Sequence, residues 1–397
     1  MTRCDLPSAN PRLRAAAAFW IAVLLAISVR VGASPRSNSV YPIFVAAGQR
    51  WAAGDSVYLE ETPGLDQFRY SPLVAAWFGA WSGWPEPAGA IVWRWLNAAV
   101  LFGGLACWLR WQERSAELGA ALILIAPLAI GGLNNGQCNA AIAGLLLIAQ
   151  VCFAREQWWP AAGAVAMAAL IKQYPIALGL LLAILEPRRF APRLAVTVAI
   201  GLAAPFLLSD PRYVADQYVA WWGRVLGDDR TAYPLANSYR DLQMLLRVWG
   251  WPLSLSGYRL LELALAVAAA AGVVFAARRG HRRHVVWSCG ALSMCWMTVA
   301  GPATESSTYV LAAPLLAACV LDRGSESRVV RVASSISWML LTVGATAVWW
   351  PRPIAQAITA TGIQPLAGAL LSLAVVALVI RGSKSATRER SGLRAAA

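Results

Sequence analysis

Uncharged apolar segments recur along this chain and constrain its fold more than any other feature. Three of them are 118–130, 141–153 and 366–380. A helix needs about 20 mostly apolar residues to cross the hydrocarbon core of a bilayer, and the chain offers many windows of this kind. Only 14% of its residues are charged, whereas a soluble domain has about 25%. We therefore predict an all-α, polytopic membrane protein with about 12 transmembrane helices.

The basic residues indicate a topology. The net charge of +14 arises mainly from arginines that cluster in short segments between the apolar runs. This pattern is typical of cytoplasmic loops under the positive-inside rule, and it predicts a plasma (inner) membrane protein with both termini in the cytoplasm. The predicted spans are 15–33, 88–109, 117–133, 138–154, 157–171, 173–185, 192–208, 257–277, 285–300, 309–321, 333–350 and 363–380.

This topology makes residues 1–397 one polytopic domain with two long outer loops and a basic cytoplasmic tail at 381–397. The first outer loop, 34–87, holds a short apolar piece at 72–84, which would form a re-entrant or interfacial helix of only about 20 Å. The second outer loop is 209–256. The first span could instead be a cleaved signal peptide. We predict a retained span, because the later alternation needs it.

Several kinds of site lack the residues that they require. The two histidines, His281 and His284, share one basic loop, and none of the seven cysteines has the spacing of a metal site. There is no P-loop and no convincing dinucleotide fingerprint, and Asp228-Asp229 is not the Asp-x-Asp of nucleotide-sugar enzymes. We therefore expect no metal, no cofactor and no nucleic-acid partner.

The unusual polar segments all fall on the predicted outer face. An ionisable residue near membrane depth is a functional hypothesis by default, because its burial costs free energy. We infer a polar site on this face from five segments: Phe68-Arg69-Tyr70-Ser71-Pro72, Asn134-Asn135-Gly136-Gln137, Lys172-Gln173-Tyr174-Pro175, Asn237-Ser238-Tyr239-Arg240-Asp241 and Pro302-Ala303-Thr304-Glu305.

Two cations in these segments are candidates for a phosphate site. Lys172 interrupts a long, almost uncharged stretch and could meet a phosphate as a point charge. It could also simply snorkel to the interface. Arg69 could bind the same phosphate, or it could pair with Asp66 within the loop. Tyr70 follows Arg69 in the same segment and is a further substrate-binding candidate.

The amide side chains of these segments and the carboxylate of Glu305 can each be interpreted in two ways. Asn134, Asn135 and Gln137 could bind sugar hydroxyls, although Asn also suits helix ends. The same alternatives hold for two residues of the second outer loop, Asn237 and Arg240. Glu305 is the only acid in a short outer loop between two spans; it is either a general base or a solvated loop residue.

Four motifs, in order, resemble those of a known family. The likeness covers about 35–320 and points to glycosyltransferase family 87, the polyprenol-phosphate-mannose-dependent mannosyltransferase-like membrane proteins. The motifs are Gly54-Asp55-Ser56-Val57-Tyr58, Phe68-Arg69-Tyr70-Ser71-Pro72-Leu73, Gly136-Gln137-Cys138-Asn139 and Ile171-Lys172-Gln173-Tyr174-Pro175.

The resemblance implies a GT-C membrane fold with a long first outer loop. It implies transfer of a hexose, mannose in the family's name, from a polyprenyl-phosphate donor to a lipid or glycan acceptor on the extracytoplasmic face. No nucleotide and no obligatory metal would be needed, and membrane lipids would surround the site. Lys172 and Arg69 would face the lipid phosphate, and Gln137 would line the sugar cavity.

The chain departs from the family pattern at two places. Family members usually carry an acid at the position of Val40, and often a histidine in the stretch that here reads Ala303-Thr304-Glu305-Ser306-Ser307-Thr308. Either the base has moved, to Glu305 first and to Asp55 or Asp66 next, or catalysis has been lost. A lipid or glycolipid transporter and a non-catalytic membrane protein are the alternative functions. A transporter would place functional charges on both faces.

Overall fold

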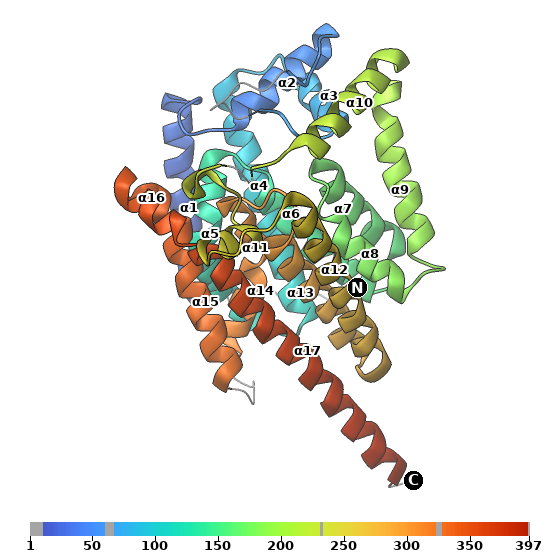
Figure 1. The fold of residues 1–397 in the computed structure, drawn as a ribbon. Helices are drawn as coiled ribbons and strands as arrows, with labels where there is room; N and C mark the ends of the chain where they lie inside the picture. The colour runs from blue at the N-terminus through green and yellow to red at the C-terminus, as the bar shows by residue number, and fades with distance from the viewer. Residues whose placement is uncertain (1–10, 60–66, 231–232, 323–327, 396–397) are drawn as a thin grey trace.

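The computed structural model describes residues 11–59, 67–230, 233–322 and 328–395, and the side chains up to Gly382. Within these residues every regular element is a helix and there is no strand, as the sequence predicts. The helices pack into one bundle, which is drawn in Figure 1.

The longer helices are α1 (Pro11–Ala33), α4 (Glu86–Trp111), α5 (Leu118–Asn135), α6 (Asn139–Ala154), α7 (Trp158–Ile171), α9 (Ala191–Ala203), α10 (Pro211–Gly227), α12 (Leu255–Arg279), α13 (Arg282–Val299), α15 (Arg328–Thr346) and α17 (Ile363–Ala395). The shorter ones are α2 (Tyr41–Ala53), α3 (Pro72–Ala80), α8 (Ile176–Leu185), α11 (Leu242–Val248), α14 (Ala313–Leu321) and α16 (Arg352–Ala360). Five 3-10 turns join them: η1 (Ser115–Glu117), η2 (Ala204–Leu207), η3 (Leu235–Asn237), η4 (Ser306–Leu311) and η5 (Ala347–Trp349).

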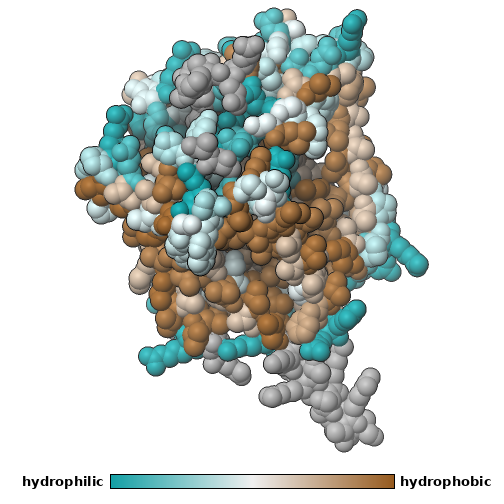
Figure 2. Space-filling view, in the orientation of Figure 1, coloured by the Kyte–Doolittle hydropathy of each residue, from teal (hydrophilic) through white to brown (hydrophobic). Residues whose placement is uncertain are grey.

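The exterior of the bundle suits a membrane. Figure 2 shows a broad hydrophobic band across the visible face of the molecule, between a largely hydrophilic end and a second hydrophilic rim. In the described part of the chain, six helical segments are long and apolar enough to cross a bilayer. They are Pro11–Ala33, Glu86–Trp111, Ser115–Asn135, Leu255–Arg279, Arg328–Trp349 and Ile363–Gly382.

Most of the remaining predicted spans form shorter helices. The predicted span at 173–185 is the ten-residue α8, about 15 Å long, which is half of the roughly 30 Å hydrocarbon core. It begins after Pro175, and Pro187 follows it closely. The predicted span at 309–321 is split into η4 and the nine-residue α14. Twelve full crossings therefore stay a prediction.

Helices α4 and α6 approach each other closely in the centre of the bundle. A Cβ atom on Gly144 would lie 2.1 Å from the carbonyl oxygen of Val100, and one on Gly104 would lie 2.4 Å from that of Gly144. Small residues are what allow helices to pack backbone to backbone within a membrane. This contact fixes the position of α6, whose first turn carries part of the candidate site.

One end of the bundle carries the long connections, and we call it the loop-rich face: α2, α3, α10, α11 and α16 with the loops at 34–40, 134–138, 172–175 and 300–305. The sequence predicts only one short helix, 72–84, in the first of the long outer loops. The structure adds α2, because apolar residues at helical spacing, among them Phe44 and Trp51, pack against α3. The second predicted outer loop likewise contains α10 and α11.

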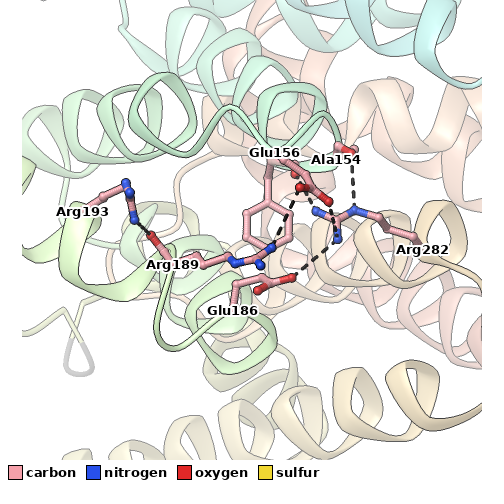
Figure 3. A network of polar contacts seen from close by, with 7 residues as sticks. Ala154, Glu156, Glu186, Arg189, Arg193 and Arg282 are labelled. Atoms are coloured by element: carbon pink, nitrogen blue, oxygen red, sulfur yellow. Dashed lines mark hydrogen bonds and ion pairs between the residues drawn. The ribbon is translucent and has the colours of Figure 1, made fainter.

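The opposite end is the arginine-rich face, where four short turns meet. Arg282 lies 3.5 Å from both Glu156 and Glu186, and Arg189 lies 3.9 Å from Glu156; Figure 3 shows these contacts. Arg283 reaches Glu113 of a fourth turn. The arginine-rich turns therefore gather at one end of the bundle and the two long connections at the other. The predicted tail at 381–397 continues α17 as far as Ala395.

Candidate functional site

Two adjoining cavities open within the loop-rich face. The larger has a volume of about 730 Å³ and the smaller about 170 Å³. Four residues line both cavities: Gln67, Arg69, Gln137 and Glu305. Of the eleven candidate site residues, nine line at least one of the two cavities: Arg69, Tyr70, Asn134, Asn135, Gln137, Lys172, Asn237, Arg240 and Glu305. The structure thus brings together segments that are far apart in the sequence.

Lys172 occupies the smaller cavity because the chain stops being helical there. It follows the last residue of α7 in an extended conformation, and Pro175 precedes α8. Its ammonium nitrogen lies 5.8 Å from the ring centre of Tyr70 and 5.9 Å from that of Tyr174. Within the described residues Lys172 makes neither an ion pair nor a side-chain hydrogen bond. The ammonium is therefore held by aromatic rings and faces the cavity without a carboxylate partner.

Glu305 lies at the junction of the two cavities. It is the N-cap of η4 and forms a capping box with Thr308, which orients both side chains. Gln137 donates a hydrogen bond from Nε2 to Glu305 Oε2 over 3.3 Å. Gly136 makes this approach possible, since it ends α5 with φ +84°, a conformation that favours glycine.

Val40, the position where an acid is usual in the resembling family, also lines the smaller cavity. Its side chain is 9% exposed, and its backbone N–H donates to the carbonyl oxygen of Asn135 over 2.9 Å. Val40, Lys172 and Glu305 therefore face one space, although the sequence separates them widely.

Arg69 is held by an acid that the sequence analysis did not pair with it. Its guanidinium lies 3.4 Å from Asp228 and donates to the Tyr239 hydroxyl over 3.1 Å. Tyr239 in turn donates to Asp228. The predicted partner Asp66, also a candidate base, lies outside the described residues. Asp55, the third candidate base, is exposed just after α2 and lines neither cavity.

Arg240 lines the larger cavity, but its guanidinium group mainly binds backbone carbonyl groups of its own loop. It donates hydrogen bonds to the carbonyl oxygens of Leu235, Ala236 and Ser238, so it ties together the loop that presents Asn237. Burial lowers the pKa of Arg240 to about 10. The neighbouring Asp241 caps α11 through the N–H of Met244 over 3.1 Å, and burial raises the pKa of Asp241 to about 6.

Two arginines inside predicted spans support the site, and the sequence analysis missed their role. Arg30 and Arg94 both donate to the carbonyl oxygen of Asn134, at 2.6 Å and 3.1 Å, and Arg30 also binds the Asn134 side-chain oxygen at 2.8 Å. Arg94 is only 1% exposed. Guanidinium groups at a helix C-terminus satisfy its free carbonyls and complement its dipole. A charge within an apolar run was the signal that could have revealed them.

Asn134 therefore acts first as part of a fixed helix end, which is the simpler of its two predicted interpretations. Asn135 donates to the side chain of Asn38 over 3.3 Å at the rim. A second buried network joins the segments below: Asn139 binds Ser307 at 2.9 Å and accepts from Tyr174 at 3.1 Å. These bonds fix the loops of Lys172 and Glu305 relative to α6.

The described residues contain no group of three or more His, Cys, Asp or Glu side chains placed to hold a metal ion. The arrangement instead offers cations, amides, tyrosine hydroxyls and the carboxylates of Glu305 and Asp228 around a partly enclosed space. Such a set suits the binding of a phosphate and of sugar hydroxyls.

Comparison with known proteins gives one family. A family model described as Glycosyltransferase family 87 matches residues 68–302, more than half of the chain. The match begins at the segment of Arg69 and ends three residues before Glu305. No curated protein matches.

Proposed function

Because this chain belongs to glycosyltransferase family 87, we propose that it transfers a hexose, mannose in the first instance, from a polyprenyl-phosphate donor to a lipid or glycan acceptor. The loop-rich face would be extracytoplasmic, in a multi-pass protein of the plasma membrane. The excess of arginine on the opposite face supports this orientation.

The composition of the smaller cavity carries the proposal. Lys172, Arg69, Gln137 and Glu305 line it together with Val40. The cavity therefore combines the Lys172 cation, which has no carboxylate partner among the described residues, with the Gln137 amide and the Glu305 carboxylate. Its other carboxylate, Asp228, is paired with Arg69. It also contains the position from which the usual acid of the family is missing. A base that has moved to Glu305 would still act on the same space.

The reaction follows from these roles. The acceptor hydroxyl oxygen attacks the anomeric carbon of the donor sugar, while the Glu305 carboxylate takes the hydroxyl proton. The bond between that carbon and the phosphate oxygen breaks, and the electron pair leaves with the polyprenyl phosphate. Lys172 and Arg69 stabilise the charge that develops on the leaving oxygen. This stabilisation is strong where water is largely excluded.

The larger cavity suits the acceptor. Its volume of about 730 Å³ lies within the roughly 300–1,000 Å³ range of ligand pockets, and it meets the smaller cavity at Glu305. Side chains that can bind hydroxyl groups line it, including Asn135, Asn237, Ser306 and Gln364. An acceptor held there would present its hydroxyl to the base at the junction.

A rescue experiment tests this assignment. Full-length protein in proteoliposomes is given radiolabelled polyprenyl-phosphate mannose and a lipid extract as acceptor pool. We expect Glu305→Gln to lower transfer by about 10²–10⁴-fold, the range for loss of a general base. The double variant Val40→Asp, Glu305→Gln should recover part of this activity, because Val40 lines the same cavity.

Asp55→Asn is the matched control, since Asp55 is an exposed acid of the same face outside both cavities, and it should transfer like the wild type. Normal transfer by Glu305→Gln, or loss in Asp55→Asn instead, would contradict Glu305 as the base. No transfer by the wild type with any polyprenyl-phosphate hexose would contradict the proposed reaction itself.

A further inference from the structure

Arg230 stands in the wall of the larger cavity, shortly after the end of α10. Its guanidinium carbon lies 4.4 Å from the ring centre of Tyr239, stacked over the ring face. A guanidinium that stacks on an aromatic ring keeps the donors along its edge available. The ring therefore fixes the orientation of Arg230 without occupying its hydrogen bonds.

No carboxylate in the described structure neutralises this guanidinium. The two carboxylates closest in sequence are Asp229 and Asp228. Asp229 is exposed, and Asp228 pairs with Arg69 at 3.4 Å and accepts from the Tyr239 hydroxyl. Within the described residues Arg230 donates no side-chain hydrogen bond and forms no ion pair. It is partly buried, so solvent compensates it only in part.

The larger cavity as a whole is positive. Three cations line it, Arg69, Arg230 and Arg240, against the single carboxylate of Glu305. Arg69 is engaged by Asp228, and Arg240 by backbone carbonyl groups of its own loop. Arg230 is the one of the three cations for which the described structure provides no acceptor.

We propose that the larger cavity takes an anionic carbohydrate, in which a phosphate or carboxylate group binds the edge of Arg230 and sugar hydroxyls bind the surrounding amides. This inference rests on the proposed function in one respect, that the ligand of this cavity is the acceptor. An arginine edge matches both oxyanions, because two parallel N–H groups meet two oxygens.

The two cavities would then use separate cations for separate anions. Lys172 lines only the smaller cavity, and Arg230 lines only the larger. The donor phosphate would lie beside Lys172, and the acceptor anion beside Arg230. The acceptor would thus be recognised by its charge at a point away from the hydroxyl that reacts at Glu305.

Binding without donor tests this inference independently of transfer. The full chain is placed in nanodiscs of phosphatidylcholine, which carries no net charge, and three radiolabelled probes are titrated: methyl α-mannoside, its 6-phosphate and the methyl glycoside of mannuronic acid. We expect at least one of the two charged probes to bind about tenfold or more tightly than the neutral one, equivalent to about 1.4 kcal/mol.

Arg230→Gln should remove this preference, and Arg230→Glu should invert it in favour of the neutral sugar, a result that an unfolded protein cannot give. Arg212→Gln removes an exposed arginine of α10 on the same face and should keep the preference. Equal binding of all three probes by the wild type would overturn the inference. A preference that Lys172→Gln removes and Arg230→Gln keeps would overturn it too, since the anion would then lie in the donor cavity.

The outcomes separate the two proposals. If the charge preference depends on Arg230 but no sugar is transferred from any donor, the anionic carbohydrate site stands and the transferase reaction fails. If sugar is transferred but neutral and charged probes bind alike, the reaction stands and the anionic acceptor fails.

Discussion

The two ends of this protein use the same cationic side chains in opposite ways. On the arginine-rich face Arg282 lies between Glu156 and Glu186, and Arg189 also reaches Glu156 (Figure 3). On the loop-rich face Lys172 and Arg230 face cavities with aromatic rings beside them and no carboxylate partner among the described residues.

We infer from this difference that the proposed binding sites are marked by unpaired charge and not by the number of charges. The pairs of the arginine-rich face are half open to water, with 41% of the Arg282 side chain and 54% of the Glu156 side chain exposed. Exposed pairs of this kind contribute about 0–1 kcal/mol. An unpaired cation in a partly closed cavity is costly to the free protein, and a bound anion offsets that cost.

The strongest test of the comparison removes one cation from each face. Lys172→Gln should lower sugar transfer in proteoliposomes by about 10²–10³-fold, the typical effect of losing one group that stabilises developing negative charge. Arg189→Gln, on the opposite face, should change transfer by less than about twofold, because its ion pair is exposed. Equal losses in the two variants would break the comparison.

The loop-rich face also contains a buried acid, Asp241, and the pH dependence of stability tests its burial. Burial raises the pKa of Asp241 from 3.8 to about 6, so the folded protein holds this proton more tightly than the unfolded chain. The stabilisation is complete below about pH 4 and is lost as the pH rises towards 6, by up to about 3 kcal/mol at 1.36 kcal/mol per pKa unit.

Asp241→Asn should remove this fall in stability, since Asn also caps helices well. The measurement is the thermal midpoint of wild type and variant in detergent at pH 4, 5, 6 and 7. Asp55→Asn, an exposed acid of the same face, serves as control and should leave the pH profile as it is in the wild type. A profile that Asp241→Asn does not flatten would show that the acid is solvated.

Much of the fold could be predicted from local sequence signals. Apolar run length gave α1, α4 and α12 within a few residues, and arginine clusters gave the alternation of turns and loops. Helix α2 was missed because its apolar residues do not form a long uncharged run, and their contacts with α3 and with Trp93 of α4 depend on distant segments. The predicted span at 173–185 forms the ten-residue α8 between Pro175 and Pro187, and its crossing of the membrane stays a prediction.

The candidate site was predictable where a polar residue interrupts an apolar run, as at Lys172 and Gln137. Partners were not predictable, because they depend on contacts between distant segments. For Arg69 the sequence offered either a phosphate or Asp66 of its own loop as partner. The structure pairs Arg69 with Asp228 of a distant segment, and Asp66 lies outside the described residues. Arg94 was left inside a span with no role, because its acceptor at Asn134 belongs to another helix.

Replacing Arg94 on the loop-rich face should have an intermediate effect on transfer, because its guanidinium group already has hydrogen-bond acceptors within the protein. It donates to the carbonyl oxygen of Asn134 and to the Ser39 hydroxyl, and it so holds the turn that presents Gln137 to Glu305. Arg94→Met should lower transfer by about 10–30-fold, because small displacements of positioning groups are costly. Arg110→Met, at the exposed end of the same helix, should have little effect.

Hydrogen exchange distinguishes a residue that positions the site from a residue that binds the substrate. Hydrogen exchange of the backbone amides at 134–137 should speed up in Arg94→Met and stay slow in Lys172→Gln. If exchange stays slow in both variants and Arg94→Met still loses transfer fully, Arg94 acts on the ligand directly.

The smallest effect is expected on the arginine-rich face, at the centre of its network. Arg282 makes two exposed ion pairs and also contacts the backbone of Phe153 at 3.2 Å. A double-mutant cycle of Arg282→Gln and Glu186→Gln should give a coupling free energy of unfolding below about 1 kcal/mol, and this coupling should weaken further in 0.5 M salt because exposed charges are screened. A coupling of several kcal/mol that persists in 0.5 M salt would mean that the Arg282–Glu186 pair is shielded from water. Charged groups would then be shielded from water on both faces. The faces would differ only in whether those charges have an oppositely charged partner.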